Sequence, residues 1–169
     1  MVNNSIKESL DFVFGNWITE KASANKIMSE NIFYNKELKK TGIEDKTYNK
    51  EKRTFQTSTL KTSQKIVNDI PKTLYQKSNI SVDSYKIEGS ISTGRLSEII
   101  WIGLFDRNIT TSAQNGYYIV YLFRSDMKGV YMSLNQGWTQ YKNTHGSKDG
   151  KLRILKIFKK LKEKLRSVQ

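Results

Sequence analysis

The N-terminal half of the chain has apolar residues at helical spacing, separated by longer polar stretches. Between residues 5 and 18 an apolar residue recurs every three or four positions, which predicts a helix with one buried stripe. Its start, Ser5-Ile6-Lys7-Glu8, has the form of a capping box, in which a hydroxyl and a carboxylate satisfy backbone donors. A further helix could form around Lys26–Lys39, and Thr59–Asp69 again has helical spacing. Pro71, the only proline, is expected to end that helix or to open a short turn.

From residue 81 onward, helical spacing gives way to short apolar runs. Three runs have the length of a strand, are rich in β-branched and aromatic residues, and are bounded by turn signals: Glu98–Phe105, Gly116–Phe123 and Val130–Leu134. Strands that are apolar at nearly every position tend to be covered on both faces. We therefore expect helices from the N-terminal half to pack against the sheet.

Together these patterns predict an α+β fold with a curved antiparallel or mixed, barrel-like sheet from residues 82–141, flanked by the N-terminal helices and a C-terminal basic helix. The length fits one domain with one core. We expect residues 1–169 to form that single domain, with a helical flank at 1–80, a β core at 81–141 and the basic helix at 151–166.

The basic segment at 151–166 also has an apolar stripe. Leu155, Phe158, Leu161 and Leu165 fall on one side of a helix, and lysines and arginines cover the rest. Three interpretations remain open at this point. The helix could dock on the sheet with a lysine-coated outer face, contact phosphate groups, or lie on a membrane surface.

Composition adds a strong positive charge that is unevenly distributed. The chain has 29 Lys and Arg against 16 Asp and Glu, a formal net charge of +13, and its last 19 residues carry more than half of this excess. Residues 81–150 are nearly neutral but contain 10 of the 19 aromatic residues. Such a charge favours a polyanionic partner, although a solvated lysine-rich surface explains it equally well.

Several classes of chemistry are excluded or disfavoured. The absence of cysteine rules out disulfides, zinc fingers and thiol nucleophiles, and the single histidine, His145, lies in a polar loop. No phosphate-binding P-loop or recognisable nuclease constellation is present. No apolar run approaches the roughly 20 residues that span a bilayer, and the N-terminus does not resemble a secretory signal. We expect a cytoplasmic binding protein that is not an enzyme, with no metal and no cofactor.

The most specific signal lies between Tyr85 and Gly137. A small-residue loop precedes a strand, Glu-Ile-Ile-Trp-Ile-Gly-Leu-Phe, and after the turn Asn115-Gly116 comes the tyrosine-rich strand Tyr-Tyr-Ile-Val-Tyr-Leu-Phe, which ends at an acidic turn. In order and spacing this segment resembles the McrB-like N-terminal domain, the DNA-recognition module of modification-dependent (type IV) restriction systems. It departs from that family at Ile100, where proline is common, and at Thr93, where an aromatic residue can stand.

The resemblance implies recognition of methylated cytosine in double-stranded DNA. Such domains rotate the modified base out of the stack and hold it between aromatic side chains, while a GTPase motor and a nuclease subunit do the cutting. No membrane partner is implied. Carried over to this sequence, the base pocket is Trp101, Tyr118 and Leu122, and the DNA-insertion loop is Ser92, Thr93, Gly94 and Arg95. We expect phosphate contacts from Lys86, Arg95, Arg107 or the C-terminal lysines to supply most of the affinity and to make it salt-dependent.

The residues themselves leave alternatives open. Trp101 and Tyr118 lie in apolar strands, where an aromatic side chain is ordinarily part of the core. Tyr117 and Tyr118 must point to opposite faces of one strand, and we choose Tyr118 for the pocket. The chain could instead read RNA or another modified base, because stacking tolerates any base. It could also be a non-catalytic protein-interaction or membrane-surface module that uses the basic C-terminal helix; a nuclease is the least favoured alternative.

Overall fold

The computed structural model describes residues 6–41, 56–91 and 96–166, apart from the side chains at 161, 164 and 165. Its first element is α1 (Ile6–Thr41), a helix of 36 residues. The predicted helix at 5–18 and the further helix at Lys26–Lys39 are thus parts of one continuous helix. Ser5 of the expected capping box lies outside the described residues.

A series of short helical elements follows. The segment predicted from Thr59–Asp69 is helical, but it does not end at Pro71, which lies in the first turn of the last of these helices. The turn before it is π-helical, and the Ile70 N–H donates to the Lys65 carbonyl. Proline has no N–H for the carbonyl four residues earlier, and this wider turn accommodates that loss. The elements are η1 (Thr57–Thr59), α3 (Lys61–Gln64), η2 (Lys65–Asp69) and α4 (Ile70–Lys77).

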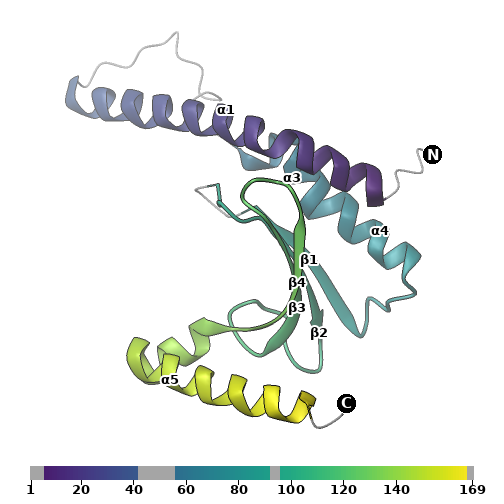
Figure 1. The fold of residues 1–169 in the computed structure, drawn as a ribbon. Helices are drawn as coiled ribbons and strands as arrows, with labels where there is room; N and C mark the ends of the chain where they lie inside the picture. Colours follow the sequence, from purple (N-terminus) through teal and green to yellow (C-terminus); the bar gives the residue numbers. More distant parts are fainter. Residues whose placement is uncertain (1–5, 42–55, 92–95, 167–169) are drawn as a thin grey trace.

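Four strands form an antiparallel sheet in the order β1-β2-β3-β4 (Figure 1). The α+β class and the antiparallel pairing are therefore confirmed. The described strands form an open sheet, so the predicted barrel-like closure is not confirmed. The strands are β1 (Tyr85–Ser90), β2 (Trp101–Asp106), β3 (Tyr117–Phe123) and β4 (Val130–Gln136).

The main core lies between the helices and one face of the sheet, here called the helix-covered face. Trp17 of α1 and Ile66 of η2 are fully or almost fully buried, and they belong to one apolar cluster with Ile102 of β2 and Phe123 of β3. The ring of Phe14 lies 5.7 Å from the ring of Phe123. Helices from the N-terminal half therefore cover this face, as the apolar strands predicted, but within the described residues the expected cover on both faces does not extend as helices to the second face.

Two side chains of the helical part satisfy backbone groups outside their own elements. The Thr62 N–H at the start of α3 donates to a Glu20 carboxylate oxygen of α1 at 3.0 Å, which caps a helix that has no cap of its own. The Tyr75 hydroxyl of α4 accepts a hydrogen bond from the Ile87 N–H at 2.6 Å and donates to the Tyr85 carbonyl at 3.2 Å. Tyr75 thus covers the outer edge of β1.

A close approach of backbones fixes the distance between η2 and β1. A Cβ atom built on Gly89 would stand 1.8 Å from the Ile66 carbonyl oxygen and 2.6 Å from its carbon. Only glycine therefore allows the strand to pack this close to the helix.

The last element is α5 (Trp138–Arg166), which has a kink at Gly146, where φ is 74°. It lies at the opposite end of the strands from α1 (Figure 1). The predicted basic helix is confirmed as its second part. Leu155 and Phe158 are 62% and 57% exposed, however, so this part of the stripe does not dock into the core. Within the described residues, no helix combines the length and the apolar character needed to cross a membrane.

Candidate nucleic-acid interface

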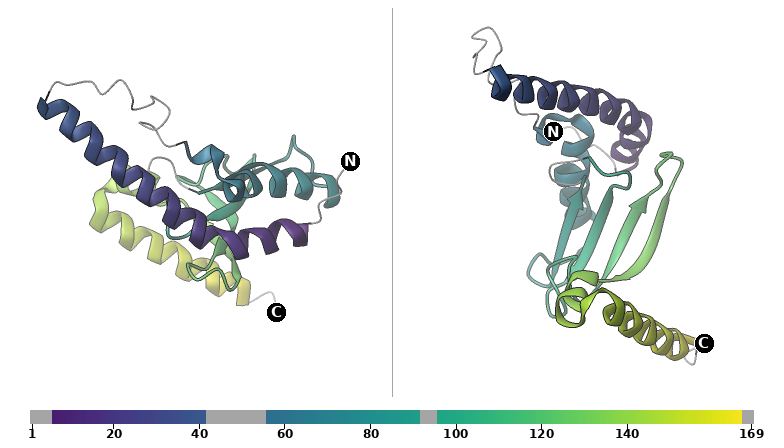
Figure 2. Two further views of the ribbon diagram at one scale, coloured as in Figure 1. Left: turned by 90° about the horizontal axis from the view of Figure 1, so that it is seen from above. Right: turned by 90° about the vertical axis from the view of Figure 1, so that its left-hand side faces the viewer.

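The second face of the sheet carries the residues that the sequence predicted for a base pocket. Because side chains alternate along a strand, the residues next to those of the helix-covered face point to the other side. Figure 2 shows this side without a helix in front of the strands, and we call it the open face. By register it comprises Lys86, Glu88, Ser90, Trp101, Gly103, Phe105, Tyr118, Val120, Leu122, Tyr131, Ser133 and Asn135.

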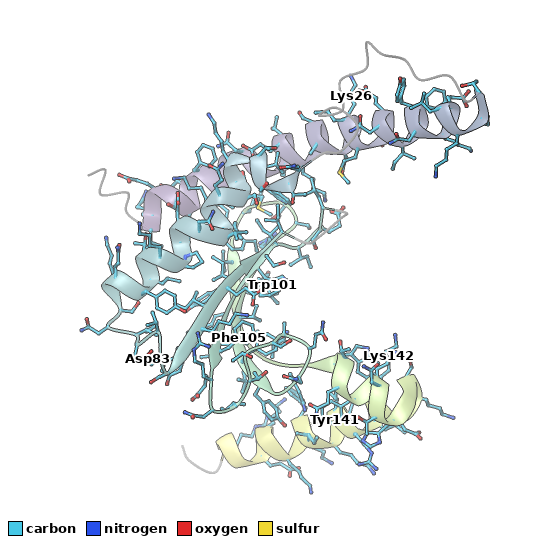
Figure 3. The ribbon with its side chains drawn as sticks, turned by 180° about the vertical axis from the view of Figure 1, so that it is seen from behind. Lys26, Asp83, Trp101, Phe105, Tyr141 and Lys142 are labelled. Atoms are coloured by element: carbon cyan, nitrogen blue, oxygen red, sulfur yellow. The ribbon has the colours of Figure 1, made fainter. Side chains whose placement is uncertain are left out.

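Trp101 and Leu122 lie side by side on the open face. They are paired residues of β2 and β3, and both are partly buried against a second, smaller apolar cluster. The side chain of Trp101 extends to the side of the sheet away from α3 and α4 (Figure 3). A flat aromatic surface and an aliphatic side chain therefore stand next to each other where a planar ligand can approach.

Phe105 belongs to the same row of rings, although the sequence did not single it out for the site. It is completely buried, two positions along β2 from Gly103. A Cβ on Gly103 would stand 2.6 Å from the Phe105 ring and 3.2 Å from the Trp101 ring, so both rings lie over this glycine. The alternation Trp101-x-Gly103-x-Phe105 was the signal that could have revealed the row.

Tyr118 lies at the far end of this row and is held firmly. Only 8% of it is exposed, and its ring lies 4.9 Å from the Phe105 ring at an interplanar angle of 31°. Its hydroxyl donates to the Ala113 carbonyl at 3.2 Å and accepts from the Asn135 side-chain amide at 3.3 Å. Leu122 lies four positions after Tyr118 along β3, about 13 Å of strand.

The loop between β2 and β3 covers this end of the open face. Ala113 packs on Phe105 and Tyr118, and the buried Thr110 hydroxyl donates to the Asn115 side chain and accepts from the Ser112 N–H. The loop is also bonded to the start of α5, whose Gln140 N–H donates to the Gln114 carbonyl at 3.1 Å. Because the loop covers Tyr118, the row of aromatic rings is closed at that end and more accessible at Trp101. 

Two of the predicted phosphate contacts, Lys86 and Arg107, already have partners in the structure. The Lys86 ammonium lies 2.5 Å from a Glu88 carboxylate oxygen, donates to the Thr111 carbonyl at 3.0 Å, and stands 5.8 Å from the centre of the Phe105 ring. Arg107 is exposed, and its Nε donates to the Val82 carbonyl at 2.9 Å. Arg95 and the rest of the predicted insertion loop, Ser92, Thr93 and Gly94, lie outside the described residues.

Comparison with known proteins gives one result. A family model described as MrcB-like, N-terminal domain, matches residues 45–169, which include the whole sheet and α5. No curated protein matches the chain, and no solved structure does.

Proposed function

Since most of its residues lie within that match, the chain belongs to the MrcB-like N-terminal domain family, and we propose that it reads a modified, methylated cytosine in duplex DNA. The base is rotated out of the duplex and stacks on the open face at Trp101. The family relationship that the segment Tyr85–Gly137 suggested is thereby established, and the proposal extends it to a ligand and to a mechanism.

One observation carries this proposal: Trp101 is partly exposed, beside Leu122, on a sheet face that no described helix covers. Extracting a base costs a few kcal/mol. Stacking on one aromatic side chain returns about 1–3 kcal/mol. A 5-methyl group adds apolar contact worth about 0.8 kcal/mol, a preference of roughly fourfold. Leu122 is the side chain placed to receive that methyl group.

Phe105 and Tyr118 have a supporting role in this proposal. The Phe105 ring lies beside the Trp101 ring over Gly103, and Tyr118 is fixed by its two hydrogen bonds. A preorganised aromatic row loses little side-chain entropy when a base stacks at its open end. The sequence-based prediction that Tyr118 itself forms a second wall remains a prediction.

Affinity for the DNA backbone comes from positive charge. The exposed lysines of α5 and the exposed Arg107 can contact phosphates, and these contacts make binding weaker as salt rises. In this proposal the chain itself performs no catalysis and needs no cofactor. It is the specificity part of a modification-dependent restriction system, and a GTPase motor and a nuclease subunit supply translocation and cleavage.

A binding panel tests the proposal. Duplexes that differ only at one cytosine (unmodified, 5-methyl, 5-hydroxymethyl or N4-methyl) are compared with an N6-methyladenine duplex and a single-stranded RNA. We expect the 5-methylcytosine duplex to bind most tightly, and 2-aminopurine beside the target base to brighten as its neighbour unstacks. Trp101→Ala should weaken binding roughly 5- to 150-fold, the equivalent of about 1–3 kcal/mol of stacking.

Matched variants separate the pocket from general effects. Phe33→Ala removes an aromatic side chain that is 68% exposed on α1, far from the sheet, and should leave discrimination unchanged. Leu122→Ala should reduce the preference for the methyl group more than it reduces overall affinity. Equal affinity across the panel, or full discrimination in Trp101→Ala, would refute the pocket; tighter binding to the RNA would favour the alternative ligand class.

A further inference from the structure

The two edge strands of the sheet differ in charge and in how their outward backbone groups are bonded. The edge at β1 has charged side chains, Lys86 and Glu88, and its outward N–H and carbonyl groups at Ile87 and Tyr85 are bonded to the Tyr75 hydroxyl. Strand β4 forms the other edge, and among the described residues no further strand pairs with it. Its sequence, Val-Tyr-Met-Ser-Leu-Asn-Gln, contains neither a charged residue nor proline. An uncharged edge strand of this length is a template for pairing with another chain.

A groove runs between β4 and the second part of α5. It has a volume of about 600 Å³ and is lined by Met132 and Leu134 of β4 and by Leu155 and Phe158 of α5. These four side chains are 50–70% exposed, so the apolar lining is accessible. Five consecutive residues of β4, 132–136, line the groove. Because successive side chains point to opposite faces of the sheet, the groove must run along the edge of the strand and not over one face.

The charges around this groove select the kind of occupant. Helix α5 contains ten lysines and arginines against two acidic residues, and the exposed Lys162 lines the groove directly. Burial, followed by the nearby Tyr141, raises the pKa of the Tyr117 hydroxyl at the other wall above its ordinary value of 10.0, so this wall adds no negative charge near neutral pH. Two copies of the chain paired at this edge would bring two basic helices together, which charge repulsion opposes. An acidic segment meets no such repulsion.

We propose that this groove binds an acidic segment of a partner protein, in extended conformation, as a fifth strand beside β4. The strand edge supplies backbone hydrogen bonds, and alternate side chains of the partner fill the space at Leu155 and Phe158. Acidic residues of the segment meet the exposed Lys162, which lines the same groove. A strand edge fits an extended peptide better than a single-stranded nucleic acid, because only the peptide can pair its backbone N–H and carbonyl groups with β4 along its length. The site is separate from the open face at Trp101.

A display library of random ten-residue peptides tests the proposal on the complete chain. We expect selection to enrich peptides that combine apolar residues at alternate positions with Asp or Glu. A synthetic peptide of the selected consensus should bind at least tenfold more weakly after Leu134→Lys or Phe158→Glu. N-methylation of alternate backbone amides on the side that pairs with β4 should also weaken the peptide at least tenfold, because it removes the edge hydrogen bonds. Lys162→Glu should lower the affinity for the acidic peptide and raise that for a version with lysines in place of its acids.

Controls separate groove binding from loss of fold and from DNA binding. Ile32→Glu introduces the same negative charge as Phe158→Glu, at an apolar residue of α1 that is 68% exposed and lies outside the groove. It should leave the peptide affinity unchanged. Trp101→Ala should also leave it unchanged, so this test and the DNA panel can fail independently. Circular dichroism confirms that each variant is folded.

Three results would overturn the proposal: selection that yields no peptide above background, a consensus without acidic residues, or a consensus peptide that binds Leu134→Lys and Phe158→Glu as well as the parent chain. A concentration-dependent dimer in light scattering that the same two substitutions abolish would assign the groove to a second copy instead.

Discussion

The close packing of η2 on β1 can be tested by adding one methyl group at Gly89. In Gly89→Ala the new Cβ would stand 1.8 Å from the Ile66 carbonyl oxygen, whereas real Cβ atoms essentially never come closer than 3.0 Å to another heavy atom. Helix and strand must therefore separate by about 1.2 Å at this point. Both atoms in conflict are held by the backbone, so a change of rotamer cannot relieve the clash.

The cost follows from what such a separation does to the core. Overpacking of a well-packed core typically costs 1–3 kcal/mol, and a conflict with backbone places Gly89→Ala at about 3 kcal/mol. For a chain of this length, each kcal/mol lowers the melting temperature by about 2–4 °C. We therefore expect Gly89→Ala to melt about 6–12 °C below the parent chain, with a matching decrease in the urea midpoint measured by tryptophan fluorescence.

Gly15 offers a matched control, in which the same change from glycine to alanine should stabilise the chain instead of destabilising it. It lies in α1, and a Cβ there meets nothing within 4 Å. Gly15→Ala should stabilise the chain by about 0.5–1 kcal/mol, because alanine loses less backbone entropy in a helix. If Gly89→Ala were as stable as the parent chain, the packing of η2 on β1 described here would be wrong.

Three further predictions concern individual polar groups. Tyr75→Phe leaves the Ile87 N–H without its acceptor and should cost about 1–2 kcal/mol, with faster hydrogen exchange at that amide. Glu20→Ala removes the cap of the Thr62 N–H and should cost about 1 kcal/mol in urea unfolding, whereas Glu20→Gln, which keeps an acceptor, should cost less. The Lys128 N–H, followed by the Arg124 side chain, lowers the pKa of Asp126 below its ordinary value of 3.8. The ionised Asp126 carboxylate therefore stabilises the fold above pH 3.8, and this stabilisation is lost as the pH falls through the lowered pKa of the folded chain. The difference in unfolding free energy between the parent chain and Asp126→Asn should accordingly shrink between pH 5 and pH 2. A difference that grows on acidification would contradict this.

The sheet was predictable from the sequence because its strands are short and bounded by strong turn signals. Each of the three apolar runs overlaps one observed strand, and the register places Tyr118 on the same face as Trp101. The sequence could not reveal that the loop before Gly116 would fold over Tyr118, since that depends on contacts made by Ala113 and Thr110 after folding.

The helices were harder to predict for a different reason. Helix α1 continues through a polar stretch that lacks a clear apolar period, so the pattern suggested separate elements. Pro71 suggested an end because proline usually breaks a helix, yet the π-turn before it absorbs the missing hydrogen bond. The exposed apolar side chains Leu155 and Phe158 show a second limit of prediction from sequence. An amphipathic pattern indicates that one face of a helix is apolar, but it does not indicate which segment or partner molecule covers that face.

The alternation of the strands has an evolutionary consequence. Along β2, Ile102 packs against the helices, whereas its neighbours Trp101 and Gly103 belong to the other side of the sheet. Selection can therefore change what the domain reads at the partly exposed Trp101, while Ile102, which packs against the helices, is kept. A library randomised at the partly exposed Trp101 and Leu122 would explore new ligands while the buried Phe105 and the crowded Gly103 stay unchanged.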